Sequence, residues 1–261
     1  MLSRMDIREY NRTAWDAQVD QKNQWTVPVD SETVARARQG DWDILLTPEI
    51  PVPRDWFPDL KDCDTLGLAS GGGQQGPILA ATGARVTVFD NSNRQLEQDR
   101  LVADREGLDI QTIQGDMANL SDFADASFDF VFHPCSNCFA ENIIPVWQEC
   151  HRVLRPGGIL MSGFTNPAVF IFDSMLIEKG ELVLRNRLPY SDLTDISPEE
   201  RQAFIEKSEP LWFGHTFDDQ IGGQLRAGFV LTAMFEDRDP TNPLSQYMPT
   251  YMATRALKTT A

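Results

Sequence analysis

Residues that could cross-link the chain or bind a metal are scarce. The sequence has 4 cysteines and 3 histidines in 261 residues, and these cysteines are too few and too unevenly placed for a disulfide framework. We therefore expect a reducing, cytoplasmic location. Cys135 and Cys138 form a C-x-x-C pair just after His133, but a second pair at ligand spacing is missing, so we expect ordinary thiols and no metal site.

Positive charge and long apolar runs are also in short supply. The 23 lysines and arginines face 39 acidic residues, which gives a formal net charge of −16. This surplus opposes binding to nucleic acid or to an anionic membrane, because such partners usually require a basic face. The sequence has no run of 18 apolar residues and no apolar signal segment in its first ten residues. It therefore predicts neither a membrane span nor a secretory signal.

The sequence does contain enough apolar residues, 41%, for a sizeable core. Residues 1–57 hold four of the six tryptophans among polar, helix-like segments. We expect them to form an N-terminal helical cap, either fastened to the surface or lining a pocket. Residues 58–261 are expected to form the main domain, and the sequence leaves the oligomeric state open.

From Cys63 onward, short apolar runs alternate with helix-like stretches, a pattern typical of βαβ units and a parallel sheet. Residues 166–213 interrupt this rhythm. They could be an insertion that closes over a site, although a peripheral hairpin and helix would give the same pattern. The predicted strands are 65–69, 86–89, 110–114, 128–132, 159–163, 229–235 and 251–257, and the predicted helices are 77–82, 92–107, 146–153 and 197–207.

The strongest local motif is the glycine-rich stretch from Ala69 to Gly76, between the first strand and the first helix of the main domain. Gly71, Gly73 and Gly76 match the pattern G-x-G-x-x-G, which lets the backbone turn sharply and bring a ligand close to a helix N-terminus. Asp90 follows Gly71 by nineteen residues at the end of the second strand. Its carboxylate could accept hydrogen bonds from a ribose diol, whether the ribose belongs to NAD or to an adenosyl sulfonium.

Further motifs follow in order along the chain. Gly115-Asp116-Met117 comes after the third strand, where a carboxylate can accept from an adenine amino group and an apolar side chain can flank the ring. Phe128–Phe132 and Leu154–Leu160 come next. From Thr65 to Gly163 the chain thereby resembles the class I S-adenosylmethionine-dependent methyltransferases, particularly their small-molecule branch.

The resemblance implies a Rossmann-like α/β fold, with a seven-stranded, mostly parallel sheet, an antiparallel final strand and helices on both faces. The N-terminal cap and the insertion after the fifth strand would be added to this core. The implied cofactor is S-adenosyl-L-methionine, and the implied partner is a small-molecule methyl acceptor. The residues expected around the cofactor are Tyr10, Trp15, Ala69, Ser70, Gly71, Gly73, Asp90, Asn91, Ser92, Asp116, Met117 and His133.

Two positions depart from the family's pattern. The family usually has an acid at the position of Gly67 and a glycine at the position of Ala69. Contacts to the methionine amino group are therefore expected from the cap, with Tyr10 and Trp15 as candidates. The chain also lacks the Asp/Asn-Pro-Pro-aromatic motif of nucleobase amino-methyltransferases after its fourth strand, which argues against a nucleic-acid acceptor.

Two histidines are candidates for a catalytic base. Methyl transfer is an in-line displacement in which positioning can supply most of the catalysis, so a base is needed only if the accepting atom must lose a proton. His133 lies at the end of the fourth strand and His215 follows the insertion. The alternative for His133 is simple packing near the cofactor. At the level of the whole protein, the alternatives are an NAD-dependent oxidoreductase and a cofactor-binding protein without catalysis.

Overall fold

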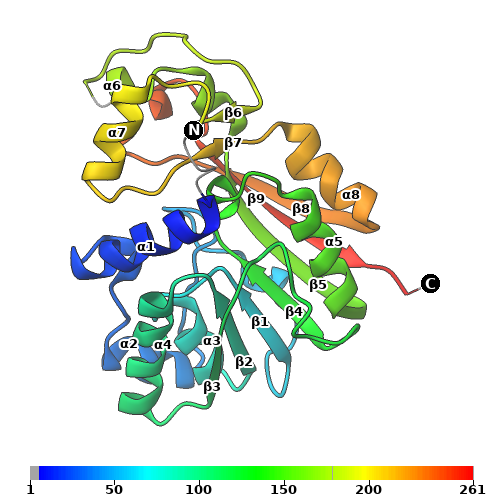
Figure 1. Ribbon diagram of the computed structural model, residues 1–261. Coiled ribbons are helices and arrows are strands. Elements are labelled where there is room, and N and C mark those ends of the chain that lie inside the picture. Colours follow the sequence, from blue (N-terminus) through cyan, green and yellow to red (C-terminus); the bar gives the residue numbers. More distant parts are fainter. Residues whose placement is uncertain (1–5, 178, 261) are drawn as a thin grey trace.

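A central seven-stranded sheet organises the molecule (Figure 1). The computed structural model describes residues 6–177 and 179–260. The strand order is β3-β2-β1-β4-β5-β9-β8, and β9 is antiparallel to both of its neighbours, whereas β1 to β5 are parallel. The predicted fold class is therefore confirmed. The strands are β1 Asp64–Leu68, β2 Arg85–Asp90, β3 Ile110–Gln114, β4 Phe128–His133, β5 Leu154–Thr165, β8 Phe229–Asp237 and β9 Tyr251–Lys258.

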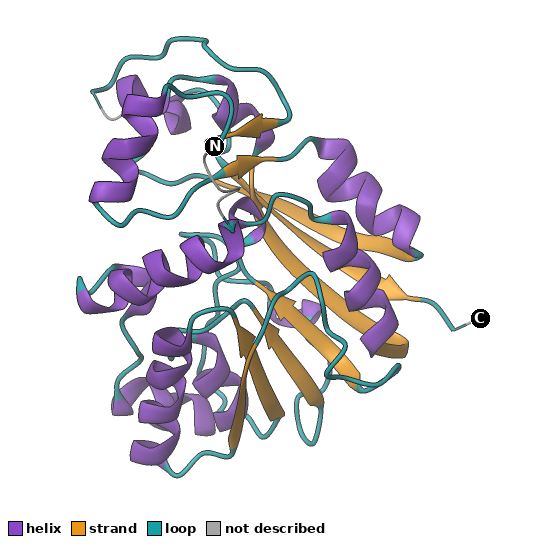
Figure 2. Ribbon diagram, viewed as in Figure 1, coloured by secondary structure: helices purple, strands orange, loops and turns teal. Residues whose placement is uncertain are grey.

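Helices cover both faces of the sheet (Figure 2). On one face, α4 packs on β2 and β3, α3 packs on β2, and α2 packs on α3; on the other face, α5 and α8 pack together beside β5 and β8. Within the described ranges, no helix is long and apolar enough to cross a membrane. The helices are α1 Ile7–Asp20, α2 Ser31–Arg38, α3 Gln75–Ala81, α4 Asn93–Glu106, α5 Ile144–Val153, α6 Ser174–Ile177, α7 Pro198–Glu206 and α8 Gly223–Ala227.

Local signals explain where the helix α4 begins and ends. The side chain of Ser92 accepts a hydrogen bond from the backbone N–H of Gln95, which satisfies one of the unpaired donors of the first turn. Gly107 ends the helix with φ of 64°, a left-handed conformation that glycine adopts at little cost. The sequence-based prediction of this helix is thus confirmed.

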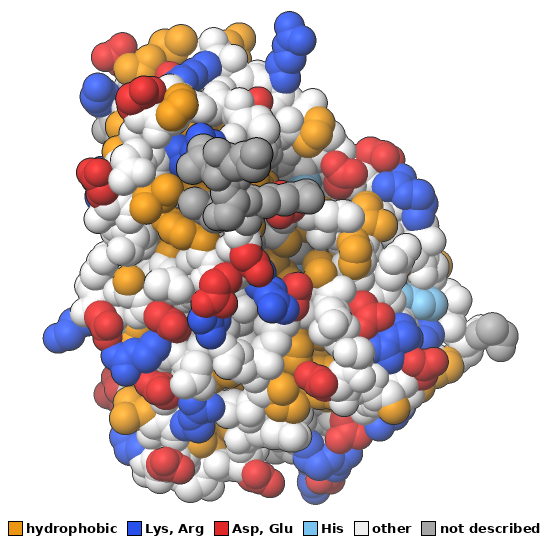
Figure 3. Space-filling model, in the orientation of Figure 1, with side chains coloured by type: hydrophobic (Ala, Val, Ile, Leu, Met, Phe, Trp, Pro, Cys, Tyr) orange, Lys and Arg blue, Asp and Glu red, His pale blue; other side chains and the backbone are white. Residues whose placement is uncertain are grey.

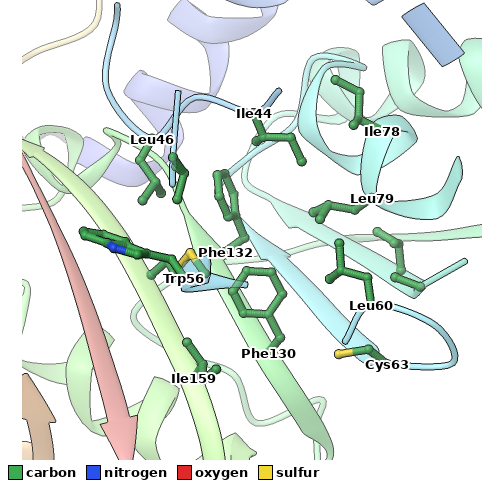
Figure 4. Close-up of a cluster of buried hydrophobic side chains, with 14 of the residues drawn as sticks. Ile44, Leu46, Trp56, Leu60, Cys63, Ile78, Leu79, Phe130, Phe132 and Ile159 are labelled. Atoms are coloured by element: carbon green, nitrogen blue, oxygen red, sulfur yellow. The ribbon is translucent and has the colours of Figure 1, made fainter. Parts of the chain in front are cut away.

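The N-terminal segment contributes to the main core. Trp56 is only 7% exposed, and it belongs to one buried cluster with Leu46, Leu79, Phe130 and Phe132 (Figure 4). Phe130 and Phe132 come from the central strand β4. The expectation that residues 1–57 are a cap outside the core is therefore wrong for the stretch that contains Leu46 and Trp56. Those residues cover a sheet face that would otherwise meet water.

The segment 166–213 forms a small unit next to the carboxyl ends of the strands. It contains α6, α7 and the strand β6 (Tyr190–Ser191), which pairs with β7 (Phe213–Gly214). The helix α1 lies between this unit and α4 (Figure 1). Asn11 of α1 joins α1 to the unit, because its side chain donates to the carbonyl of Leu211 and accepts from the N–H of Leu211.

Candidate active site

The carboxyl ends of the parallel strands open into a cavity of about 1470 Å³. In open α/β sheets this edge is where ligands bind. The strands β1 to β5 contribute the residues that follow their carboxyl ends, and α1, residues 43–49 and the end of the insertion supply the remaining walls. Among the sequence-predicted residues, the cavity is lined by Trp15, Ala69, Ser70, Gly71, Asp90, Asn91, Asp116 and Met117.

The glycine turn is fixed to the end of β2 through Asp90. One oxygen of the Asp90 carboxylate accepts from the N–H of Gly71 at 2.9 Å and the other from the N–H of Ser92 at 2.9 Å. A Cβ atom at Gly71 would lie 2.7 Å from the Cβ of Gln95, so the turn tolerates only glycine at this point. Burial raises the pKa of Asp90, partly offset by these two N–H groups.

Two cavity-lining residues beside this turn each have a buried polar atom with no partner in the described protein. These atoms are the hydroxyl of Ser70, which is 3% exposed, and the side-chain oxygen of Gln95, which is 5% exposed. Both residues line the cavity. Since buried polar groups are nearly always paired, these atoms fit a polar ligand such as the amino-acid part of S-adenosylmethionine.

Ser70 lies next to Gly67, the position at which the family usually has an acid. The hydroxyl of Ser70 would lie 2.5 Å from a Cβ atom built on Gly67. A carboxylate side chain at position 67 therefore cannot coexist with this placement of Ser70. The backbone at Ala69 is left-handed, with φ of 47°, a conformation in which glycine is the commoner residue.

The turn after β3 lines the same part of the cavity as the glycine turn and Asp90. We call this part, which also includes Asp116, the nucleotide half. Asp116 lines the cavity, and one of its carboxylate oxygens accepts from the N–H of Ala118 at 2.9 Å. A Cβ atom at Gly115 would lie 2.0 Å from the ring of Phe89, which is itself fully buried. Glycine there lets the chain cross the ring closely and places Met117 on the wall.

Four of the residues expected around the cofactor do not line the cavity, namely Tyr10, Gly73, Ser92 and His133. The hydroxyl of Tyr10 donates to the carbonyl of Glu209 at 2.7 Å, so this side chain ties α1 to the insertion. Gly73 faces away, because a Cβ atom there would meet Pro28 and the Gln98 carbonyl. The Ser92 hydroxyl is fully buried and donates to Asp16 at 2.6 Å.

Neither predicted catalytic histidine reaches the cavity, which corrects that expectation as well. His133 has no exposed surface, and its ring nitrogens lie 2.9 Å from the Leu68 carbonyl and 2.8 Å from the Asn137 side-chain oxygen. His215 is 7% exposed, and its Nε2 faces the carbonyls of Asn137 and Ala140. Burial lowers the pKa of both imidazoles. These rings hold loops in place and do not face a substrate.

Sequence reasoning missed Asp99, a second carboxylate that holds the glycine turn. It is fully buried on α4 and accepts from the N–H of Gly72 at 3.1 Å. Burial raises the pKa of Asp99 to about 8. The available signal was its spacing, because Asp99 lies three residues after Leu96 and three before Val102, on the buried face of the helix.

The thiols near the site give no sign of a metal centre. Cys135 and Cys138 line the cavity, and burial raises the pKa of both thiols. The Cys135 thiol donates to the carbonyl of Leu46 at 3.3 Å. Across residues 6–177 and 179–260, no three or more His, Cys, Asp or Glu side chains are grouped so that they could hold a metal ion.

Comparison with known proteins places this architecture in a family. Residues 66–162 match the family described as Methyltransferase domain. The chain is 50% identical over 249 residues to "Uncharacterized methyltransferase YbaJ" of Bacillus subtilis (strain 168), a match that covers 95% of this chain and 97% of that protein. The chain belongs to the class I S-adenosylmethionine-dependent methyltransferases. Its cofactor is S-adenosylmethionine, which decides against the NAD-dependent alternative.

More distant relatives are consistent with this family membership. A protein named "Sterol 24-C-methyltransferase ERG6A" from Gibberella zeae is 36% identical over 90 residues, which cover 34% of this chain and 23% of that protein. The crystal structure of an S-adenosylmethionine-dependent methyltransferase from Mesorhizobium loti shares the fold. The two structures match with a TM-score of 0.60 and 17% sequence identity. The match covers 78% of this chain and 94% of the Mesorhizobium loti chain.

Proposed function

We propose that this methyltransferase transfers the methyl group of S-adenosylmethionine to a small-molecule acceptor held in the cavity. The observation that carries the proposal is one continuous cavity that begins at the turn bonded to Asp90 and extends to the insertion. Its volume of about 1470 Å³ exceeds the roughly 300–1,000 Å³ typical of a site for one small ligand. A cofactor and an acceptor therefore have room side by side.

The bound cofactor would supply an electrophilic methyl group on a sulfonium, which is a good leaving group. In this proposal Asp90 accepts from the ribose hydroxyls, Asp116 accepts from the adenine amino group, and Met117 packs against the ring. Ser70 and Gln95 face the methionine part. Their unpaired buried atoms support this assignment.

A further set of residues would act by holding these groups in place. Ser92 and Gly73 would stabilise the glycine turn on the side away from the cavity, and Tyr10 would anchor α1 beside the cavity. We propose that catalysis is mainly positioning and exclusion of water, since the described cavity wall carries no imidazole. His133 and His215 then serve to fix the loops around Asn137.

A small acceptor and a reducing compartment fit the remaining features. Acidic and basic side chains are interspersed on the face shown in Figure 3, and the net charge of −16 opposes a nucleic-acid acceptor. All four cysteines are free thiols, which supports the cytoplasm as the location.

Calorimetric titration tests the proposal directly. The protein is titrated with S-adenosylmethionine, S-adenosylhomocysteine and NAD, and it is then incubated with pools of small-molecule acceptors while release of S-adenosylhomocysteine is followed. We expect saturable binding of both sulfur compounds, no binding of NAD, and turnover with at least one pool. Tight cofactor binding with lasting silence across broad acceptor pools would favour the non-catalytic alternative.

A further inference from the structure

Three aromatic rings form a corner on the cavity wall at the end nearest the insertion. They are Trp15 of α1, Phe139 after β4, and Trp212 at the end of the insertion, and all three line the cavity. The ring centroids of Trp15 and Phe139 are 5.1 Å apart with an interplanar angle of 81°, and those of Phe139 and Trp212 are 5.1 Å apart at 66°. Trp212 is 37% exposed, and an accessible face of such a ring attracts a cation.

A pair of hydroxyl side chains lies on the wall where β5 and β9 meet. Thr165 and Tyr251 are directly opposite each other in the antiparallel ladder, and both line the cavity. Thr165 is 7% exposed, and its hydroxyl has no hydrogen-bond partner in the described protein. Because a buried hydroxyl without a partner is costly, this position calls for a polar atom of a ligand. Burial raises the pKa of Tyr251, so the phenol keeps its proton and can donate.

The charges on the wall are mostly negative. Asp90 and Asp116 belong to the nucleotide half. Around the rest of the cavity, the acids are Asp43, Glu49, Glu141, Glu206, Glu209 and Asp239, and the bases are Arg8 and Lys207. Lys207 lies 3.9 Å from Glu209, which offsets part of its charge. A wall with this balance repels a carboxylate or phosphate and attracts a cation.

The wall also limits what the accepting atom can be. None of the chain's three histidines lines the cavity. An alcohol or a carbon acid needs a base to become nucleophilic at neutral pH. An amine that enters as an ammonium ion loses its proton to water or to a carboxylate of the wall, and its neutral form then has a free lone pair.

We propose that the methyl acceptor is an amine with an apolar body, bound between the Thr165–Tyr251 pair and the corner of Trp15, Phe139 and Trp212. The proposal rests on the proposed methyl transfer. The nitrogen lone pair forms the new N–C bond while the C–S bond breaks, and that electron pair remains on sulfur as a neutral thioether. The nitrogen becomes an ammonium ion, which releases a proton to water if it carries one.

Binding of a product-like cation tests the site without any turnover. The protein, saturated with S-adenosylhomocysteine, is titrated calorimetrically with benzyltrimethylammonium and, separately, with phenylacetate. We expect the ammonium to bind at least tenfold more tightly than the carboxylate. Trp212→Leu, which keeps an apolar side chain but loses the ring face, is expected to weaken ammonium binding at least fivefold.

A matched variant tests whether the effect on ammonium binding is specific to the ring of Trp212 or follows the loss of any aromatic side chain. Phe217 is 45% exposed and does not line the cavity, so Phe217→Leu should leave ammonium binding unchanged. Equal or tighter binding of phenylacetate would overturn the proposal, as would unchanged ammonium affinity in Trp212→Leu.

A competition assay addresses the reaction itself. Release of S-adenosylhomocysteine is measured with matched sets of amines, alcohols, phenols and carboxylic acids that share the same apolar bodies. We expect amines alone to be methylated, and Thr165→Val to lower kcat/KM for the amine at least fivefold with unchanged affinity for S-adenosylhomocysteine. Turnover of alcohols or phenols but not amines would refute the amine acceptor while methyl transfer stands. Failure to bind S-adenosylhomocysteine would instead refute the proposed function.

Discussion

Asp90 illustrates how one side chain can both build and serve a site. Two backbone N–H groups already bind its carboxylate, so the turn and the end of β2 hold each other in place. Asp90 also lines the cavity. The sequence predicted that Asp90 ends the second strand, which the structure bears out, and its contact with the ribose stays a prediction.

Asp90→Ala should abolish most cofactor affinity. Hydrogen bonds to a charged group contribute about 1.5–3 kcal/mol each, so we expect the Kd of S-adenosylhomocysteine in calorimetry to rise at least tenfold. Asp104, an exposed acid on α4, provides the control Asp104→Ala, for which we expect unchanged affinity. Equal affinity in Asp90→Ala and the wild type would refute the ribose assignment.

Asp99 should make stability depend on pH. Its pKa is raised to about 8, first by burial and also by Asp90, against the N–H groups of Gly72 and Gly73 and the charge of Arg100. The folded protein therefore keeps a proton that the unfolded chain releases near pH 4. Between about pH 4 and pH 8 the folded state binds more protons, so this carboxyl lowers stability as pH rises, by about 1.4 kcal/mol per pH unit.

Asp99→Asn removes that titration. Urea unfolding of this variant and the wild type at pH 5, 6 and 7 should show their free energies of unfolding diverging in favour of Asp99→Asn as the pH rises. The other shifted groups are common to both proteins, so they cancel in the difference. Asp104→Asn is the matched control. A difference that stays constant across this range would contradict a buried, protonated Asp99.

At the scale of elements, α1 connects the two halves of the cavity. Asp16 accepts from Ser92 on the nucleotide side, and Asn11 bonds to Leu211 and to the Phe139 carbonyl on the insertion side. Loss of these bonds should let the insertion move without unfolding the sheet. The sequence could indicate a helix here, but its partners lie some 80 to 200 positions away in the chain, beyond the reach of local patterns.

Asn11→Ala should therefore loosen the contact between α1 and the insertion. Leaving the buried N–H of Leu211 without its acceptor costs about 1–3 kcal/mol. We expect faster hydrogen exchange at Leu211 and Trp212, with unchanged exchange in β1 and β4. Thr13→Ala on the exposed face of α1 is the control, and equal exchange rates in the two variants would contradict the bridging role.

The strands and helices of the main domain were largely predictable, with one instructive exception. The prediction for β3 matches its observed bounds, since three of the five residues in Ile110–Gln114 are β-branched, which favours a strand. β5 begins earlier than predicted, at Leu154, because Leu154 pairs with Phe128 across a register shift in β4. The Pro156-Gly157-Gly158 pattern indicates a turn, and these residues do form an irregularity between the pairs Phe128–Leu154 and Phe130–Ile159, where Gly157 has a left-handed φ of 84°.

At the scale of the whole molecule, the main error concerned the N-terminal segment. Polar helices there indicated a cap, and the cavity wall does include Trp15 and Trp25. The same segment sends Trp56 into the core, where its ring lies 5.2 Å from that of Phe235 on β8. Amphipathic pattern predicts that a segment has an apolar side, but it does not reveal which sheet face that side will cover. The sequence placed His133 correctly at the end of β4, but it could not reveal the burial of the His133 ring, which depends on neighbours distant in sequence.

The tryptophans of this segment should differ sharply in their effect on stability. Removal of a buried aromatic ring typically costs about 3–5 kcal/mol, and we expect a loss of this size for Trp56→Ala in urea unfolding. Trp25 is 40% exposed, so Trp25→Ala should cost less than about 1 kcal/mol. A loss of less than about 1 kcal/mol in Trp56→Ala, as small as that expected for Trp25→Ala, would contradict a structural role of Trp56 in the main core.

The position of β9 has a consequence for the order in which the protein is made. β9 lies between β5 and β8, so β8 has no neighbour in the sheet until residues 251–258 arrive. The glycine turn, Asp90 and Asp116 are synthesised more than a hundred residues earlier. A nascent chain can therefore assemble its nucleotide half well before Tyr251 completes the opposite wall. A translational stop just before Tyr251 would remove β9 and leave β8 without a neighbour in the sheet.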